Sequence, residues 1–171
     1  MSTTATLEPK AGKAAPRRPQ LGNFAHVSFP CRDIEEGKKF YVEVLGGKQR
    51  VNTPTFCAFM FGEVEIGIGN QGCTFMDPTH EYPHIAFYCD APTIVAMKEW
   101  LTACGIPTSN FWTRHGKETL MFFLDPSGNV IELYCKEGHP DAPNMPKGPP
   151  RGHGTAVDLG KLHYSKWSLP G

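Results

Sequence analysis

Three residues that lie far apart along the chain have the side-chain types that bind divalent metals: His26, His84 and Glu132. Glu132 stands inside the apolar run VIELY at residues 130–134. An ionised carboxylate in a core strand costs several kcal/mol unless a cation or hydrogen-bond donors compensate its charge. Two imidazoles and one carboxylate form the facial triad of non-haem iron enzymes, which leaves coordination positions open. A fold that brings these side chains together would therefore form a metal site.

The alternation of side chains along strands predicts on which face each candidate lies. In the predicted strand 24–29, Val27 and Phe29 belong to the apolar face that packs on a helix. The opposite faces of this strand and of the predicted strands 84–89 and 129–135 carry His26, Ser28, His84, Tyr88 and Glu132. A single inward histidine is more often a hydrogen-bonded core residue than a ligand. The equivalent positions of two histidines, each in the first strand of a module, favour a shared metal.

Two segments, at about residues 22–70 and 82–137, have the same predicted order of a strand, a helix and three strands. Asp33 and Asp90 are the predicted N-caps of the two helices, and glycines end both helices. Later strands are predicted at 48–52, 55–61, 63–69, 108–113, 118–124 and 129–135. We therefore expect an α+β fold in which two βαβββ modules form a half-open eight-stranded barrel around the metal site.

The composition limits the classes of partner. The 171 residues have a formal net charge of zero, so nothing favours nucleic acid or an anionic membrane. There is no apolar run of about 18 residues that would span a bilayer. The six cysteines form no C-x-x-C pair and no evident disulfide framework. This pattern is typical of a reducing compartment, and we expect a cytoplasmic protein.

The two ends of the chain differ from the middle in composition. Residues 1–20 are rich in Ala, Pro, Lys and Thr and are predicted to be a disordered arm before the domain at 21–137. Residues 138–171 are rich in Gly and Pro but contain large apolar side chains, including Tyr164 and Trp167. We expect the end of this tail to dock on its own domain or on a partner, and we expect a homodimer.

The stretches HVSFPCRDIEEGKKFYVEVLGG, HIAFYCD and FFLDPSGNVIELY resemble the vicinal oxygen chelate superfamily. That superfamily includes glyoxalase I, fosfomycin-resistance thiol transferases, type I extradiol dioxygenases and bleomycin-resistance proteins. The resemblance covers about residues 22–137, and it implies paired βαβββ modules with metal ligands at His26, His84 and Glu132. The fourth ligand of glyoxalase I, a glutamate, falls near Gly67, with Glu65 two residues away.

The stretch TRHGKETLMFFLDPSGNVIE is similar to the longer signature of the extradiol dioxygenases. This resemblance implies a catalytic role for His115, which would hydrogen-bond a bound catecholate. Phe122 stands where those enzymes have a tyrosine, and residues 63–70 contain no counterpart of their acid–base histidine. The resemblance implies an Fe(II)-dependent enzyme that cleaves a catechol-like aromatic ring with dioxygen. The substrate contacts would come from His115, Phe122, Tyr88 and Ser28.

Two other functions fit the same residues. The first is a metal-dependent glyoxalase-like isomerase or lyase, or a thiol transferase, that uses Mn, Zn or Ni and needs no dioxygen. The second is a non-catalytic protein that binds a small ligand, as the bleomycin-resistance members do, and needs no metal.

Overall fold

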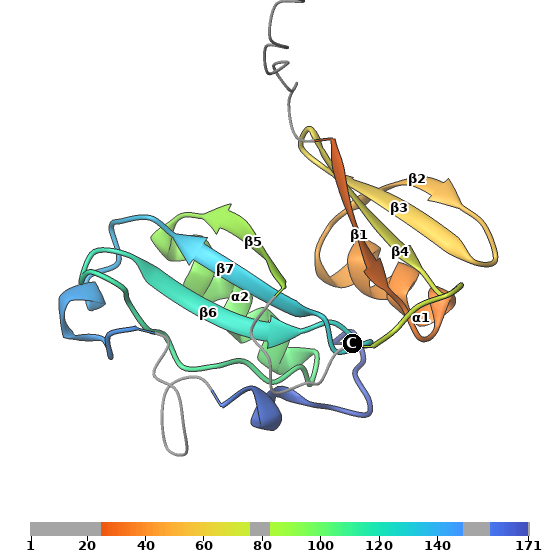
Figure 1. Cartoon of the computed structure of the whole chain (residues 1–171). Coiled ribbons are helices and arrows are strands. Elements are labelled where there is room, and N and C mark those ends of the chain that lie inside the picture. Colours follow the sequence, from red (N-terminus) through yellow and green to blue (C-terminus); the bar gives the residue numbers. More distant parts are fainter. Residues whose placement is uncertain (1–24, 76–82, 149–157, 171) are drawn as a thin grey trace, which may run out of the picture.

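The computed structural model describes residues 25–75, 83–148 and 158–170, so the predicted arm at 1–20 lies outside the described residues. The fold is α+β and contains both predicted modules, the second with one strand fewer than predicted (Figure 1). The first module consists of β1 (His26–Pro30), α1 (Ile34–Lys39), η1 (Phe40–Val44), β2 (Lys48–Asn52), β3 (Phe56–Phe61) and β4 (Val64–Gly69). The second consists of β5 (His84–Cys89), α2 (Ala91–Ala103), β6 (Thr119–Leu124) and β7 (Val130–Cys135), and the short turns η2 (Ala142–Asn144) and η3 (Leu159–Leu162) follow it.

Both helices begin at the predicted caps. The side chain of Asp33 accepts hydrogen bonds from two backbone N–H groups of the first turn, and Asp90 accepts one from Thr93 at 2.9 Å. The first helix then widens into the π-turn η1, which closes with a bond from the Leu45 N–H to the Phe40 carbonyl at 3.2 Å. The wide turn accompanies full burial of the consecutive residues Phe40 and Tyr41.

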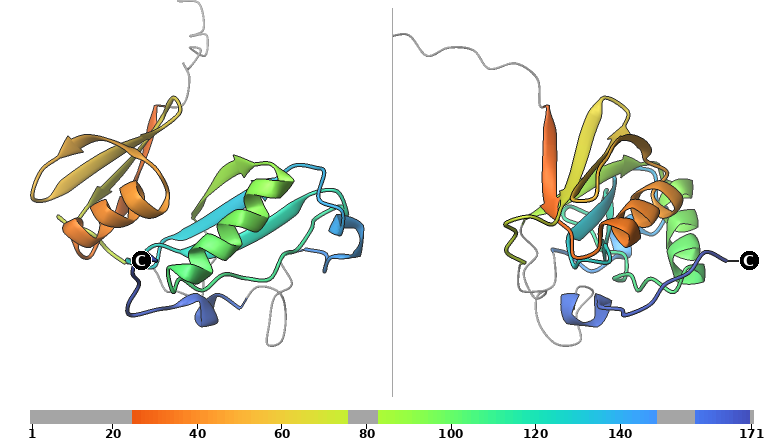
Figure 2. Two further views of the ribbon diagram at one scale, coloured as in Figure 1. Left: turned by 180° about the vertical axis from the view of Figure 1, so that it is seen from behind. Right: turned by 90° about the vertical axis from the view of Figure 1, so that its right-hand side faces the viewer.

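The strands form two separate sheets, with the order β1-β4-β3-β2 in the first and β5-β7-β6 in the second. The pairs β1–β4 and β5–β7 are parallel, and the others are antiparallel. Figure 1 shows the two sheets apart, so they do not close into a barrel within the chain. From behind, α1 and α2 both lie in front of their sheets, which leaves the opposite faces of the sheets facing away from the helices (Figure 2).

One of the eight predicted strands, at 108–113, is not formed as a strand. In the described residues this segment makes only isolated bridges, from Thr108, Trp112 and Thr113. The physical reason lies at Ser109, whose hydroxyl oxygen accepts the Phe122 N–H at 2.9 Å. The Phe122 N–H thus donates to a side-chain hydroxyl, whereas in a regular antiparallel ladder it would donate to a backbone carbonyl.

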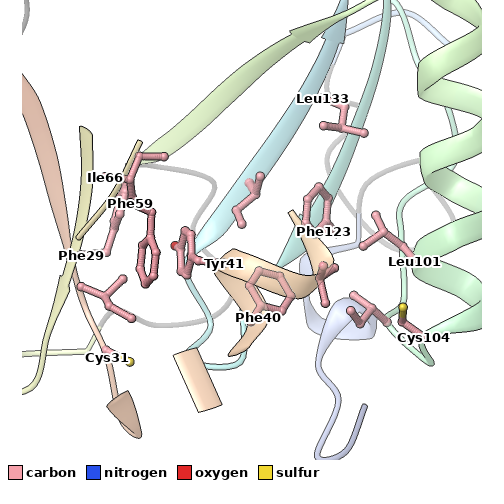
Figure 3. Close-up of a cluster of buried hydrophobic side chains, with 14 of the residues drawn as sticks. Phe29, Cys31, Phe40, Tyr41, Phe59, Ile66, Leu101, Cys104, Phe123 and Leu133 are labelled. Atoms are coloured by element: carbon pink, nitrogen blue, oxygen red, sulfur yellow. The ribbon is translucent and has the colours of Figure 1, made fainter. Parts of the chain in front are cut away.

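The main core lies between the two modules, on the helix side of both sheets. Figure 3 shows aromatic and aliphatic side chains from both modules in this cluster. Tyr41 stacks on Phe59 with ring centroids 5.3 Å apart, and Phe61 contacts Phe87 edge to face at 4.9 Å. The indole N–H of Trp100 donates to the Val44 carbonyl at 3.2 Å. The stack of Tyr41 on Phe59 lies within the first module, whereas the other two contacts join the modules through their helix-bearing faces.

A second, smaller cluster covers part of the other face of the second sheet. Its buried members are Trp112, Leu120, Phe122, Leu124, Val130, Leu159 and Leu162. The last two come from η3, and the hydroxyl of Tyr164 donates to the Leu124 carbonyl at 3.0 Å. Farther along, the indole N–H of Trp167 donates to Glu36 in α1 at 3.2 Å. The segment 158–170 therefore packs against both modules of its own chain.

Asp125, in the turn between β6 and β7, ties the modules together at one end. Its buried carboxylate accepts the backbone N–H groups of Ser127 at 2.9 Å and Asn129 at 2.8 Å. It also accepts the Tyr41 hydroxyl of the first module at 3.2 Å. The side-chain amide of Asn129 bridges this carboxylate and the Pro30 carbonyl, at 2.7 and 2.9 Å. The turn therefore fixes the end of β1 and the first helix against the second module.

This carboxylate makes stability depend on pH. Burial raises the pKa of Asp125 from its ordinary 3.8 to about 6, although its hydrogen bonds oppose the shift. A raised folded-state pKa gives stability that is complete below about pH 4 and is lost as the pH rises through about 6. We expect the free energy of unfolding to fall by about 2–3 kcal/mol across this range.

Urea unfolding at steps between pH 4 and 7 measures this effect. The Asp125→Asn variant should lose most of the slope, because its side chain does not titrate, while Asp141→Asn, at an exposed aspartate, should keep it. An unchanged slope in Asp125→Asn would show that other groups cause the pH dependence.

None of the helices in the described ranges is long and apolar enough to cross a bilayer.

Candidate metal centre

His84 and Glu132 meet on the face of the second sheet that points away from α2. Glu132 lies on the central strand β7, directly opposite Ala86 of β5 and Phe122 of β6. His84 is two residues before Ala86 and therefore points to the same face of β5. Its Nε2 atom lies 2.9 Å from Oε2 of Glu132. Strand register alone thus brings together two residues that are 48 positions apart in the sequence.

The carboxylate of Glu132 is buried beside one imidazole and one more distant guanidinium. The residue is 1% exposed, and Oε2 makes no hydrogen bond, although His84 lies close and the Arg114 guanidinium lies 3.7 Å away. A buried charge of this kind is costly unless a cation binds it. An imidazole nitrogen and a carboxylate oxygen that face each other are a fitting pair of ligands for a divalent metal.

A surface depression of about 320 Å³ opens over this pair, and its lining residues are His84, Ala86, Tyr88, Arg114, Glu132 and Tyr134. Tyr88 is 83% exposed and contacts Tyr134 edge to face at 5.4 Å. Burial and then the nearby Glu118 carboxylate raise the pKa of Tyr134, so its hydroxyl stays protonated at neutral pH. Beneath the surface, the Phe122 ring packs against the His84 imidazole at 5.4 Å.

His26 lies on the other sheet. It is exposed on the edge strand β1, on the face away from α1, and Ser28 is exposed on the same face. In the part of the chain that the structure describes, no group of three His, Cys, Asp or Glu side chains is arranged to hold a metal ion. The structure therefore brings His84 and Glu132 together and leaves His26 on the open face of the first module.

The position that resembles the fourth ligand of glyoxalase I is filled by an aromatic ring. Gly67 pairs with Ser28 and with Ala58 in the first sheet. A Cβ atom on Gly67 would lie 2.7 Å from the Phe56 ring and 2.7 Å from the Ser28 hydroxyl. The neighbouring candidate, Glu65, forms an ion pair with Arg50 at 2.5 Å. Neither position offers a free carboxylate.

This close approach predicts a measurable cost of adding one methyl group. Gly67→Ala should lower the free energy of unfolding by about 1–3 kcal/mol, because the methyl group overlaps the Phe56 ring. Thermal or urea unfolding measures the loss. In a Phe56→Leu background the same substitution should cost clearly less, and an equal cost in both backgrounds would argue against this contact.

The remaining substrate candidates are placed differently by the structure. His115 is exposed in the loop before β6, where its backbone N–H donates to Glu118 at 3.1 Å. The depression over Glu132 is lined instead by the preceding residue, Arg114, which sequence reasoning missed. The only feature of the sequence that could have indicated Arg114 is its position directly before the predicted site residue His115. Phe122 lies under the site, while Tyr88 lines it.

Comparison with known proteins gives a consistent set of relatives. The profile of the Glyoxalase/Bleomycin resistance protein/Dioxygenase superfamily matches residues 23–133. The chain is 22% identical over 111 residues to the metallothiol transferase FosB of Staphylococcus saprophyticus, which covers 64% of this chain and 74% of the relative.

Two solved structures share the fold. The fosfomycin resistance protein FosX of Listeria monocytogenes, complexed with Mn(II) and sulfate, matches with a TM-score of 0.60 and 18% identity, over 72% of this chain and 96% of FosX. The lactoylglutathione lyase of Agrobacterium tumefaciens matches with a TM-score of 0.56 and 18% identity, over 67% of this chain and 93% of the lyase.

These relatives correct the expected reaction. The prediction of a ring-cleaving dioxygenase acting on a catechol-like substrate is wrong, because the named relatives are a metallothiol transferase, a fosfomycin resistance protein and a lyase. The residues agree with this correction. Phe122 replaces the tyrosine of the extradiol signature, and His115 lies outside the lining of the depression.

Proposed function

Because the chain belongs to the glyoxalase/bleomycin resistance protein/dioxygenase superfamily, we propose that it is a divalent-metal enzyme of the thiol-transferase or glyoxalase-like kind. The observation that carries the proposal is the Glu132 carboxylate, which is buried beside His84 beneath an open depression. A buried carboxylate next to an imidazole in the lining of an accessible depression is the arrangement expected where a metal and a small substrate bind together.

In this proposal His84, Glu132 and His26 hold the metal, and Mn(II) is the first choice because the FosX structure contains it. The bound cation would supply Lewis acidity toward an oxygen atom of the substrate. Glu132 supplies the negative charge that attracts the cation, and the Phe122 ring restricts the orientation of the His84 imidazole. The hydroxyls of Tyr88 and Tyr134 lie at the rim, where they can donate hydrogen bonds to substrate oxygens.

The third ligand leads to a proposal about assembly. His26 and the His84–Glu132 pair belong to different sheets, and these sheets do not close on each other. The edge strands β1 and β5 and the open faces beside them are available to a second chain. We propose that two copies pair the first sheet of one with the second sheet of the other. Each metal site then takes His26 from one copy and His84 with Glu132 from the other.

An activity assay with defined metals tests the proposed reaction class. Protein stripped of metal and reloaded with Mn(II), Ni(II) or Zn(II) is incubated under nitrogen with fosfomycin plus a thiol, and separately with methylglyoxal plus glutathione. We expect turnover of at least one pair, with dependence on the metal and no need for dioxygen. Loss of turnover in chelator is the internal control. Absence of metal-dependent turnover on both pairs would contradict the proposal.

A further inference from the structure

Arg114 places a positive charge at the rim of the candidate metal centre. Its Nη2 atom lies 3.7 Å from Oε2 of Glu132, and its side chain is 44% exposed in the depression. The guanidinium also lies 5.6 Å from the centroid of the Trp112 ring. A separation of 3.7 Å is too long for a hydrogen bond, so the contact with Glu132 leaves the N–H donors of the guanidinium largely unused.

Other nearby charges do not neutralise this arginine. Among the described residues, Glu132 is the carboxylate with which Arg114 forms an ion pair. Glu118 lies in the same loop, but its carboxylate accepts the backbone N–H of His115 at 3.1 Å. Hydrogen bonds from the backbone of its own turn also lower the pKa of Glu118. The carboxylate of Glu118 is therefore bound to the backbone of the loop rather than to Arg114.

A divalent metal on Glu132 would change the balance of charge around Arg114. One carboxylate with two neutral imidazoles leaves part of the charge of the cation uncompensated, and the guanidinium adds to that excess. The attraction of Arg114 to Glu132 then weakens, because the metal neutralises the carboxylate. The planar guanidinium of Arg114, beside a metal cation, is suited to bind an oxyanion. Two of its N–H groups can donate parallel hydrogen bonds to two oxygens of the anion.

We infer that Arg114 binds an anionic oxygen group of the substrate, so that the substrate of this site is a carboxylate or a phosphonate rather than a neutral molecule. This inference rests on the proposed metal site and adds the substrate class to it. Arg114 is then a specificity-determining residue, since the anion that it binds fixes the remaining substrate oxygens over Glu132.

Binding of small probes to the Mn(II)-loaded full chain tests the inference without any turnover. Isothermal titration and the Mn(II) electron paramagnetic resonance signal are followed with methylphosphonate, acetate and the neutral propane-1,2-diol. We expect at least one anion to bind more tightly than the diol, and the two anions distinguish a phosphonate substrate from a carboxylate substrate. Arg114→Ala should weaken the binding of that anion by about 10- to 100-fold, and Arg114→Lys should recover part of the loss.

The controls separate this inference from the metal site. Arg32→Ala removes an arginine that lies over Phe75, outside the depression, and should leave anion binding unchanged. Arg114→Ala should bind Mn(II) at least as tightly as the wild type, because a nearby positive charge is removed. Equal binding of the anions and the diol, or no effect of Arg114→Ala on anion binding, would overturn the inference and leave the metal site standing. Failure of the wild-type chain to bind Mn(II) would overturn both.

Discussion

Glu132→Gln should reduce the affinity for Mn(II) by more than about 100-fold, which exceeds the usual effect of residues that only support a ligand. The amide has the same shape as the carboxylate, so it fits between Ala86 and Phe122 without a new cavity. It removes the negative charge that attracts the cation. In the metal-free state the amide keeps a polar oxygen or nitrogen toward His84 and loses only the long ion pair with the half-exposed Arg114, so the free energy of unfolding should change by no more than about 1 kcal/mol.

Two measurements together make this prediction sharp. Titration with Mn(II) gives the affinity, and thermal unfolding with and without Mn(II) gives the stabilisation by the metal. The wild type should gain stability with Mn(II), and the variant should gain almost none. Glu99→Gln is the matched control, since Glu99 is exposed on α2, on the side of the second sheet away from the proposed centre. Equal metal affinity of wild type and Glu132→Gln would refute the proposed centre.

Two variants that each lose metal binding should restore it when they are mixed. In the proposed symmetric dimer, His26→Ala and Glu132→Gln would each damage every site. In a mixed dimer, one site combines the intact His26 of one copy with the intact Glu132 of the other, while the second site has both defects. With random exchange of subunits, about a quarter of all sites should bind Mn(II) normally.

Refolding the two variants together and counting tight Mn(II) sites measures this recovery. Mixing His84→Ala with Glu132→Gln is the control, because these two residues belong to the same half of the site. That mixture should recover no sites. Recovery in neither mixture, with a monomer in sedimentation experiments, would show that the three ligands do not meet across two copies.

Local rules of sequence predicted the placement of the candidate residues within each sheet. Alternation assigned Ile131 and Leu133 to the helix side of β7 and Glu132 to the opposite side, and the two clusters of buried residues follow this division. The caps at Asp33 and Asp90 were also predictable, because a carboxylate can accept the unpaired N–H groups of a first turn. Each of these features depends on a few neighbouring residues.

Features that depend on long-range contacts were not predictable in the same way. The segment 108–113 has a strand-like composition, but the Ser109 hydroxyl binds the Phe122 N–H and interrupts the ladder. The two modules pack through core side chains on their helix-bearing faces, such as Phe61 against Phe87, and this packing leaves the opposite faces of the sheets apart. No periodicity in the sequence specifies whether the faces of the sheets close on each other within one chain.

The reaction was the least predictable property. A set of two histidines and one glutamate predicts a metal site, but it does not predict what a bound metal would do. That choice depends on side chains that surround the substrate, and here the structure replaces the predicted His115 with Arg114 in the lining. Arg114 belongs to a loop, and the direction of a loop side chain is not set by the alternation that placed Glu132.

The π-turn at Phe40–Val44 has a consequence for comparing this chain with others. Such a turn holds one residue more than an α-turn, so it marks the place where one codon can be gained or lost with little change to the rest of the helix. Deleting that residue would convert the turn into an ordinary α-turn and leave the residues on both sides on their present faces, whereas the same deletion in a regular α-helix would rotate one side by about 100°. Alignments with related chains should therefore allow a single-residue gap here, or residues on either side of it will be matched out of phase.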